Sequence, residues 1–275
     1  MSRITIVVPC YNEAERLPAD VFREFVRADE ARDVSFLFVN DGSRDNTAAI
    51  LNSLAKTEPR MRAMHLAKNG GKAEAVRQGM LAALANSPDY LGYWDADLAT
   101  GLDEIPRFAR VLDGRSQTHV VFGTRIPLLG RDIRRSFKRH VCGRLFATAA
   151  RRTLSLRIYD TQCGAKLFRN GPMIPQVFGE RFLARWIFDV EILARWRCLQ
   201  PKSLQQQVYE LPLEAWRDVA GSKLKGSDFV KAAGELAAIH RRYVLSRWTP
   251  RLDESDAPQS LPLPAADQEP RRKAA

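Results

Sequence analysis

The chain has 275 residues, of which 45% are hydrophobic and 27% are charged, a composition typical of one large globular domain or two small ones. Its formal net charge of +11 favours a negatively charged partner, such as nucleic acid, anionic lipid or a phosphorylated substrate. The spacing of the four cysteines and four histidines argues against a zinc site, and no apolar run reaches the ~18 residues that cross a bilayer.

Strands and helices alternate through the first hundred residues. Apolar runs rich in β-branched and aromatic side chains predict four strands, at residues 4–8, 34–39, 61–66 and 90–94. Helical spacing of apolar residues predicts helices between them, at residues 14–31, 45–56 and 73–86, with Asn12 as the cap of the first. This alternation is typical of βαβ units, so we predict a mostly parallel sheet flanked by helices.

Polar side chains follow these strands. Asp41 comes after the second strand, Lys72 follows two glycines after the third, and Asp95 and Asp97 come directly after the fourth. Because the carboxyl ends of parallel strands lie at one edge of a sheet, we expect these four side chains to converge at a ligand-binding cleft. Two carboxylates one residue apart suit a hard divalent cation, although the pair alone also fits a polar turn.

Two common nucleotide-binding motifs are missing from the sequence. No G-x-G-x-x-G follows the first strand, which argues against a dinucleotide site. No G-x-x-x-x-G-K-[ST] occurs, which argues against a P-loop nucleoside triphosphatase. RNA-binding and zinc-finger patterns do not appear either, so positive charge is the one feature that supports a nucleic-acid-binding protein.

The second half of the chain adds further strands and a basic segment. Residues 120–122 predict a fifth strand that leads to Arg125, a loop at 160–166 leads into another strand, and residues 208–213 predict one more. Residues 134–156 combine basic side chains with apolar positions at helical spacing. That pattern fits either a helix on a membrane surface or an ordinary helix packed on the core.

The C-terminal region predicts a last helix and a tail. The helix covers residues 227–248, and we expect Trp248, beside arginines, to lie at the level of lipid headgroups. Beyond Pro250 the chain is rich in proline and polar residues. We therefore predict one domain at residues 1–248 and a disordered polar and basic tail at 249–275. The cysteine usage and the early first strand predict a reduced, cytosolic protein without a signal peptide.

Several segments together carry a resemblance to a known family. The order and spacing of three of them resemble the signature of family 2 glycosyltransferases: Val7–Glu13, Asn40–Thr47 and Trp94–Asp97. Later segments resemble the dolichyl-phosphate glucosyltransferase branch: residues 160–166, 185–191 and 216–223. The related dolichyl-phosphate mannosyltransferases share the general plan, and the resemblance covers about residues 3–245.

The resemblance implies a single domain of the glycosyltransferase-A type, with a Rossmann-like sheet that holds a nucleotide-sugar donor. The donor-binding residues that it implies are Pro9, Tyr11, Glu13, Asp41, Lys72, Asp95 and Lys223. Asp95 and Asp97 are implied to hold Mg²⁺ or Mn²⁺ against the donor diphosphate. The lipid-phosphate relatives often carry glutamine two residues after the second aspartate; Ala99 at that position removes one contact near the metal.

The same resemblance implies an acceptor-phosphate site made by Arg125, Arg135, Ser136 and Arg139, where guanidinium groups bind phosphate oxygens in pairs. A lipid phosphate is already ionised at pH 7 and needs no strong base. If the acceptor were a hydroxyl, Asp189 or Glu191 would be the candidate base. The predicted catalytic residues are Asp95, Asp97, Arg125 and Asp189. Gln162 and Lys166 are further predicted to contact the sugar or the phosphates. Asp189 and Glu191 are predicted to bind sugar hydroxyls as a pair.

The hypothesis from the sequence is a hexosyltransferase that uses inverting, metal-dependent chemistry. It transfers glucose from UDP-glucose to a dolichyl or other polyprenyl phosphate, as a peripheral protein at the cytoplasmic face of an anionic membrane, with no nucleic-acid partner. One alternative is a soluble family 2 enzyme that acts on a saccharide or protein hydroxyl. Others are a GDP-mannose-using mannosyltransferase and, from another class, a basic protein that binds nucleic acid or tethers to membranes.

Overall fold

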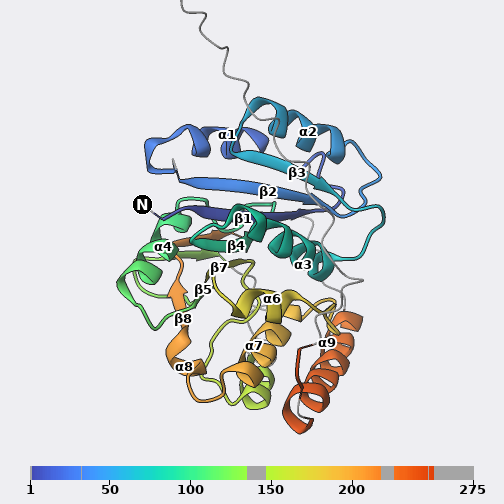
Figure 1. Ribbon diagram of the computed structural model, residues 1–275, viewed down its shortest axis with the longest axis vertical. Helices are drawn as coiled ribbons and strands as arrows, with labels where there is room; N and C mark the ends of the chain where they lie inside the picture. The colour runs from blue at the N-terminus through green and yellow to red at the C-terminus, as the bar shows by residue number, and fades with distance from the viewer. Residues whose placement is uncertain (1, 32, 135–146, 218–225, 247, 251–275) are drawn as a thin grey trace, which may run out of the picture.

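The computed structural model describes residues 2–31, 33–134, 147–217, 226–246 and 248–250. In these residues, helices cover both faces of one central sheet (Figure 1). The predicted α/β class and single domain are therefore confirmed. The predicted tail at 249–275 lies almost entirely outside the described residues and stays a prediction.

The central sheet has seven strands in the order β3-β2-β1-β4-β7-β5-β8. They are β1 Ile4–Cys10, β2 Val34–Asn40, β3 Met61–His65, β4 Tyr90–Trp94, β5 Val120–Thr124, β7 Ala165–Arg169 and β8 Val208–Pro212. Neighbours are parallel except at β7, which runs antiparallel to both β4 and β5. The sheet is thus mostly parallel, as predicted, and β7 begins at the edge where the other strands end.

Alternating side chains of the strands build two cores, one on each face of the sheet. Ile6 and Val8 of β1 pack in a cluster with α1, α2 and α4, whereas Val7 packs in a cluster with α3, α6, α7 and α9. This explains why β1 reads as a continuous apolar run. The helices are α1 Ala19–Arg27, α2 Thr47–Thr57, α3 Lys72–Ala83, α4 Glu104–Gly114, α6 Met173–Phe178, α7 Phe188–Leu199, α8 Leu204–Gln207 and α9 Gly226–Ile239, the last continued by a π turn at His240–Leu245.

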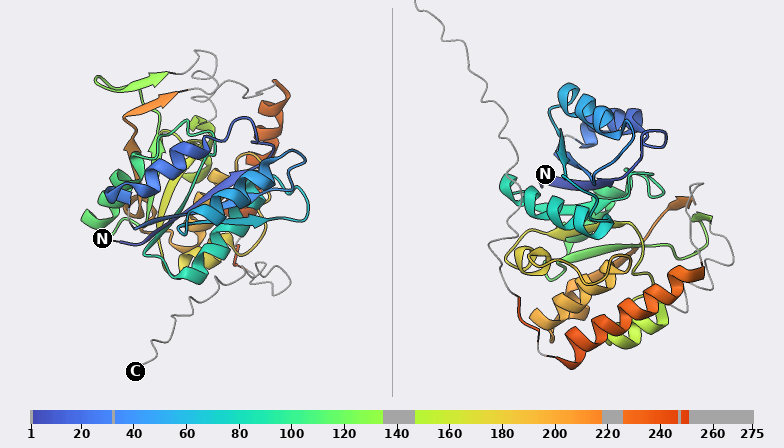
Figure 2. Two further views of the ribbon diagram at one scale, coloured as in Figure 1. Left: turned by 90° about the horizontal axis from the view of Figure 1, so that it is seen from above. Right: turned by 90° about the vertical axis from the view of Figure 1, so that its right-hand side faces the viewer.

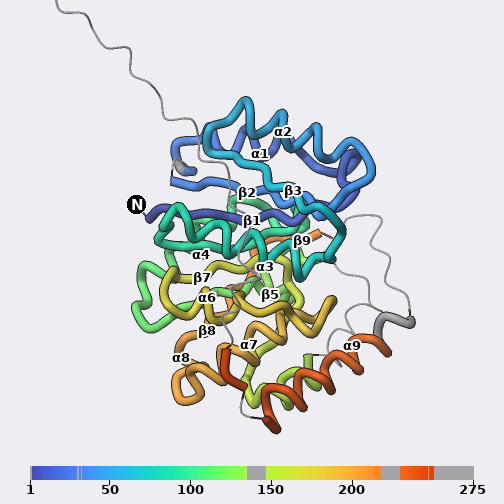
Figure 3. The backbone as a smooth tube through the Cα atoms, turned by 45° about the vertical axis from the view of Figure 1, so that its right-hand side comes forward, coloured from blue at the N-terminus to red at the C-terminus, as the bar shows by residue number. Residues whose placement is uncertain are grey.

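The order of the elements along the chain broadly follows their position in the molecule, from one end to the other. Figure 3 shows α1, α2 and β3 at one end of the molecule and α7 and α9 at the other. The sheet extends from β3 near the first end to β8 toward the other, so its carboxyl edge collects side chains from both halves of the sequence.

Three local expectations from the sequence are wrong. The first helix begins at Ala19 and not at residue 14. Asn12 does not cap it, because Asn12 has a φ of 52° and its side-chain oxygen accepts the N–H of Arg44 at 2.9 Å. Trp248 does not lie at an exposed surface: it is 7% exposed, and its ring packs edge-on against Tyr243 with centroids 5.4 Å apart.

Part of the basic stretch predicted at 134–156 is described. Residues 147–154 are helical, and Ala150 and Leu154 pack in the same core as α7. For this part the structure supports the core-packed alternative, while residues 135–146 lie outside the described residues. Within the described ranges, no helix combines the length and the apolar character needed to cross a bilayer.

A second, two-stranded sheet does not appear among the predicted elements. Its strands are β6 Asp132–Arg134 and β9 Ala215–Arg217, which pair in parallel. In both views of Figure 2 this ribbon stands out from the body of the molecule, on the side toward which the N-terminal end of α9 points.

Candidate functional site

The predicted site residues lie at the carboxyl edge of the sheet. Asp41 follows β2, Asp95 follows β4 and Arg125 follows β5. Because β7 runs the other way, the segment before it, residues 160–164, reaches the same edge. The N–H of Asp95 donates to the carbonyl of Gly164 at 3.1 Å, which joins the two segments directly.

Lys72 forms an ion pair with Asp95, in which Nζ lies 2.5 Å from Oδ1. Lys72 is the first residue of α3, and Gly71 before it has a φ of 89°, a conformation that favours glycine. Burial by itself lowers the pKa of the Lys72 ammonium, but the carboxylates of Asp95, Asp189 and Asp97 outweigh burial and raise that pKa. The lysine therefore holds its charge at a helix N-terminus, where an anion is also favoured.

Asp97 stands beside Asp95, and its Oδ1 accepts the N–H of Ala99 at 3.1 Å. Burial, and after it the negative charge of Asp95, raise the pKa of Asp97. Two carboxylates that repel one another form a donor set that a hard divalent cation neutralises, so these residues fit Mg²⁺ or Mn²⁺. No group of three or more His, Cys, Asp or Glu side chains in the described residues could hold a metal. A cation here therefore needs further ligands from water or a substrate phosphate.

Gly164 is a site residue that the sequence reasoning missed. A Cβ atom at this position would lie 1.9 Å from Oδ2 of Asp95, far closer than two such atoms approach one another. The missing side chain is what lets the segment before β7 pass against the Asp95 carboxylate. A glycine next to a strand was the signal that could have found it, since it often marks a close approach of the backbone.

Asp41 organises the loop that precedes Lys72. Its carboxylate accepts the N–H groups of Gly70 at 2.7 Å and Gly71 at 2.8 Å, and the side-chain amide of Asn69 at 2.9 Å. Burial raises the pKa of Asp41, while the two backbone N–H groups oppose that change. With 2% of the residue exposed, Asp41 has a clear structural role, and its predicted contact with a nucleotide base stays a prediction.

The other described donor-site candidates lie at the end of β1. Pro9 is within the strand, Tyr11 follows it with 42% of the residue exposed, and Glu13 forms an ion pair 2.7 Å long with the arginine three residues later. The N–H of Asp41 donates to the carbonyl of Cys10 at 2.8 Å, so this end of β1 adjoins Asp41. The exposed ring of Tyr11 is suited to stacking on a base.

Arg125 makes a two-point ion pair with Asp160. Its Nε lies 2.6 Å from Oδ2 and its Nη2 lies 2.8 Å from Oδ1, and the guanidinium carbon lies 5.1 Å from the centroid of the Trp216 ring. Burial lowers the pKa of Arg125, but Asp160 outweighs burial and raises it. Asp160 occupies Nε and Nη2 of Arg125. A phosphate would have to bind the remaining N–H donors of the guanidinium, and this contact stays a prediction.

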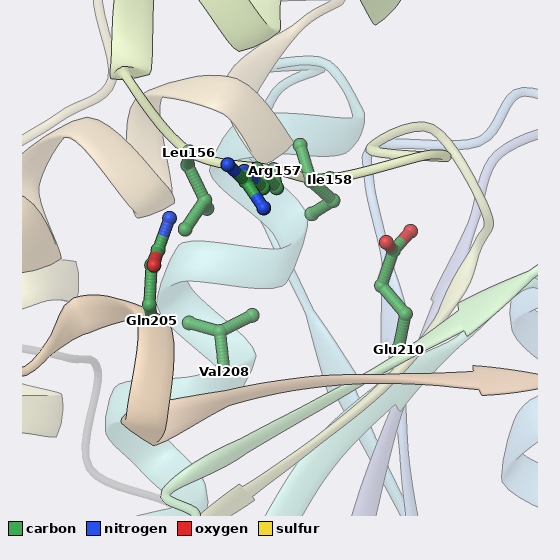
Figure 4. A pocket seen from close by; sticks show the side chains of 6 residues that line it. All are labelled: Leu156, Arg157, Ile158, Gln205, Val208 and Glu210. Atoms are coloured by element: carbon green, nitrogen blue, oxygen red, sulfur yellow. The ribbon is translucent and has the colours of Figure 1, made fainter.

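Glu210 of β8 supports this ion pair. Its carboxylate oxygens accept the N–H groups of Tyr159 at 2.7 Å and Asp160 at 2.8 Å. Glu210 also lines a cavity of about 210 Å³, shown in Figure 4. The lining residues are Leu156, Arg157, Ile158, Gln205, Val208 and Glu210. None of the predicted donor or metal residues is among them, so this cavity is not the predicted donor pocket.

Lys166, Asp189 and Tyr93 form a buried charged cluster. Nζ of Lys166 lies 2.6 Å from Oδ1 of Asp189, and the Tyr93 hydroxyl donates to the same oxygen at 2.5 Å. Lys166 is 0% exposed and also donates to the carbonyl of Cys163. The prediction that Lys166 faces a sugar or phosphate is therefore wrong. Asp189 lies in the first turn of α7, where Lys166 balances its charge.

Glu191 points into the protein interior. It is 0% exposed, and its carboxylate accepts hydrogen bonds from Arg195 at 2.8 Å, from the Tyr243 hydroxyl at 2.6 Å and from the N–H groups of Leu183 and Ala184. Residues two apart on a helix do not share a face. The predicted use of Asp189 and Glu191 as a pair that grips sugar hydroxyls is therefore wrong.

Four predicted site residues lie outside the part of the chain that the structure describes. They are Arg135, Ser136, Arg139 and Lys223. Their predicted contacts with an acceptor phosphate and with a donor diphosphate stay predictions.

Comparison with known sequences identifies relatives over most of the chain. A family model described as Glycosyl transferase family 2 matches residues 5–174. A dolichyl-phosphate beta-glucosyltransferase of Trichomonas vaginalis is 33% identical, over 93% of this chain and 76% of that protein. Proteins of the same description from Dictyostelium discoideum and Homo sapiens are 30% and 27% identical, over 89% and 92% of this chain and 76% and 79% of their own lengths.

Solved structures share the fold at lower identity. A glucosyl-3-phosphoglycerate synthase from Mycobacterium tuberculosis, in complex with Mn²⁺, UDP-glucose and phosphoglyceric acid, is 15% identical with a TM-score of 0.62, over 87% of this chain and 80% of that chain. A mannosyltransferase from Pyrobaculum calidifontis, in complex with GDP-mannose and Mn²⁺, is 16% identical with a TM-score of 0.59, over 90% of this chain and 66% of that chain. These two likenesses concern the fold.

Proposed function

This chain belongs to glycosyl transferase family 2, and from that premise we propose that it transfers glucose from UDP-glucose to the phosphate of a dolichyl or other polyprenyl carrier, with inversion at the anomeric carbon. The predicted family, the enzyme class and the glycosyltransferase-A type of fold are confirmed. Glucose and the lipid phosphate are supported by the descriptions of the relatives. We place the reaction at the cytoplasmic face of a membrane, to which the enzyme binds peripherally.

The observation that carries this proposal is the meeting of two charge systems at one edge of the sheet. Lys72, Asp95 and Asp97 form the first, and Arg125 with Asp160 forms the second. The N–H of Asp95 is bonded to the segment that carries Asp160, and the charge of Asp95 contributes to the raised pKa of Arg125. The first system suits a donor diphosphate with its cation, and the second suits the phosphate of an acceptor.

On the donor side, Asp95 and Asp97 would hold Mg²⁺ or Mn²⁺, which would supply positive charge against the negative charge of the leaving UDP. Lys72 and the N-terminus of α3 bind the diphosphate, because an ammonium and unpaired N–H groups both favour phosphate oxygens. The uridine contacts come from Pro9, Tyr11, Glu13 and Asp41, and Lys223 adds a further contact to the diphosphate.

On the acceptor side, Arg125 binds the lipid phosphate together with Arg135, Ser136 and Arg139. A phosphate oxygen attacks the anomeric carbon of glucose from the face opposite UDP; the bond from that carbon to the UDP oxygen breaks, and the configuration inverts. The acceptor is already ionised at pH 7, by analogy with phosphoserine, whose second pKa is about 6, so the step needs no base. Asp189, whose charge Lys166 balances, acts on the donor side instead, since its carboxylate contributes to the raised pKa of Lys72.

Assays with pure donors and acceptors test the proposal. We expect UDP-glucose and polyprenyl phosphate to give a glucosyl lipid of the corresponding mass, and a chelator to stop its formation. A product from GDP-mannose and none from UDP-glucose would mean that the donor is GDP-mannose and not UDP-glucose. Transfer to saccharide or protein hydroxyls, with no glycolipid formed, would contradict the lipid-phosphate acceptor.

Substituting Gly164 by alanine is expected to lower kcat/KM about 10²-fold without unfolding the protein. The added Cβ would lie 1.9 Å from Oδ2 of Asp95, so that carboxylate must move, and a displacement of about 1 Å at a reacting centre costs on the order of 10²-fold. The matched control is Gly171→Ala, where a Cβ has no atom within 4 Å. Kinetics of the two variants, with circular dichroism of each, check the prediction; equal activities would contradict it.

A further inference from the structure

The loop between β5 and β6 ends in a tight turn with an apolar apex. The N–H of Arg131 donates to the carbonyl of Leu128 at 3.1 Å, and Gly130 has a φ of 82°, which together describe a type II β-turn. Leu128 is 48% exposed and Leu129 is 104% exposed. Turns usually carry polar residues, so two adjacent exposed leucines at this apex point to a surface that covers them.

Arginines lie in this leucine turn (residues 128–131) and in the β6–β9 ribbon that follows it. Arg131 lies 3.0 Å from Glu214, and Arg134 and Arg217 both bind Asp132, at 2.8 and 3.2 Å. The Arg134 and Arg217 side chains remain 70% and 69% exposed. Glu214 also pairs with Arg107 at 3.4 Å, so four arginines share two carboxylates in the segments that adjoin this turn, in a chain whose net charge is +11. Apolar tips flanked by cations suit the boundary between acyl chains and anionic headgroups.

The leucine turn is directly connected to the acceptor side of the site. Leu129 follows Arg125 by four residues, and Arg125 is held in place by Asp160. The β6–β9 ribbon stands out from the molecule on the side to which the N-terminal end of α9 points (Figure 2), and Val230 near that end is 75% exposed. A lipid phosphate approaches from the headgroup layer, so the surface beside Arg125 has to meet that layer.

We propose that the leucine turn inserts into an anionic lipid surface and thereby presents Arg125 to phosphates at headgroup depth. This inference rests on the proposed lipid-phosphate acceptor, because that acceptor requires the site to open toward a membrane. Leu128 and Leu129 supply the apolar contact, and the arginines of the β6–β9 ribbon supply attraction to anionic headgroups.

Vesicle binding tests the proposal. The variant is Leu128→Ser with Leu129→Ser, which changes exposed side chains, and the control is Val21→Ser on α1, where valine is 46% exposed. With vesicles of phosphatidylcholine and phosphatidylserine, we expect the double variant to bind at least about tenfold more weakly than the unaltered protein and the control to bind equally. Equal binding of the double variant, or no binding of the unaltered protein, overturns the proposal.

Two acceptors separate this inference from the proposed function. With a short, water-soluble polyprenyl phosphate, the double variant should keep the rate of the unaltered protein. With a long polyprenyl phosphate in vesicles, its rate should fall at least about tenfold, in line with its weaker binding. An unchanged rate in vesicles overturns the inference. If the unaltered protein uses neither acceptor, the proposed function fails, while the vesicle-binding result still decides whether the turn contacts membranes.

Discussion

Replacing Asp95 by asparagine is expected to lower kcat/KM for glucose transfer by at least about 10³-fold while the protein stays folded. The amide keeps the size of the carboxylate but loses the charge that, in the proposed function, holds a divalent cation. It also removes the negative charge opposite Lys72, whose Nζ lies 2.5 Å from Oδ1. Since 34% of the Asp95 side chain is exposed, the substitution leaves no buried group in an apolar environment, and stability should change little.

Two measurements check this expectation. Calorimetric titration with Mn²⁺ in the presence of UDP should detect binding to the unaltered protein and much weaker binding to Asp95→Asn. The control is Asp20→Asn on α1, the same chemical change at a carboxylate that is 86% exposed and pairs with Arg23 on its own helix; its activity should be normal. Full activity of the unaltered protein in excess chelator would contradict the metal role of Asp95.

The sequence predicted the part of the site that consecutive βα units build. Asp41, Lys72 and Asp95 each follow a strand of the parallel half of the sheet, and the structure brings them together as expected. This prediction succeeded because periodicity reveals parallel strands, and parallel strands place their ends at a common edge. The ion pair itself could not be deduced, since its geometry depends on how α3 is held by the loop that Asp41 fixes.

The antiparallel strand β7 accounts for much of what the sequence did not reveal. A strand inserted between β4 and β5 in the reverse direction gives no periodic signal of its own orientation. Its position brings Asp160 to Arg125 and Gly164 to Asp95. These contacts join residues 35 and 69 positions apart in the sequence. Asp160 could therefore be identified as the partner of Arg125 once the fold was known.

Buried charge was the other feature hidden from the sequence. Lys166 and Glu191 looked like ligand-binding residues, because charged side chains are seldom fully buried. Each is instead 0% exposed, with an oppositely charged partner nearby: Asp189 for Lys166 and Arg195 for Glu191. Lys166 and Asp189 come from different elements of the fold. Pattern reasoning assigns a charge to a surface by default, and it fails where tertiary structure supplies a partner.

Substituting Arg195 by methionine is expected to lower the free energy of unfolding by about 3–5 kcal/mol. Arg195 is 0% exposed and donates to Glu191 at 2.8 Å and to the carbonyls of Val177 at 2.8 Å and Glu180 at 2.7 Å. It thus connects α7 with the end of α6 and with the segment after it. Methionine fills similar space but leaves the Glu191 charge and these carbonyls without the guanidinium, and a buried charge that loses its partner is strongly destabilising.

Urea unfolding of two arginine-to-methionine variants measures this effect. The comparison is Arg23→Met, which breaks an exposed ion pair 2.6 Å long within one turn of α1, and should cost about 1 kcal/mol or less. Arg195→Lys keeps the charge but has a single donor group in place of the guanidinium fork, so it should fall between the unaltered protein and Arg195→Met. Equal losses for Arg195→Met and Arg23→Met would mean that the buried pair contributes no more than a surface pair. Apolar packing alone would then have to hold α7 against the end of α6 and the segment after it.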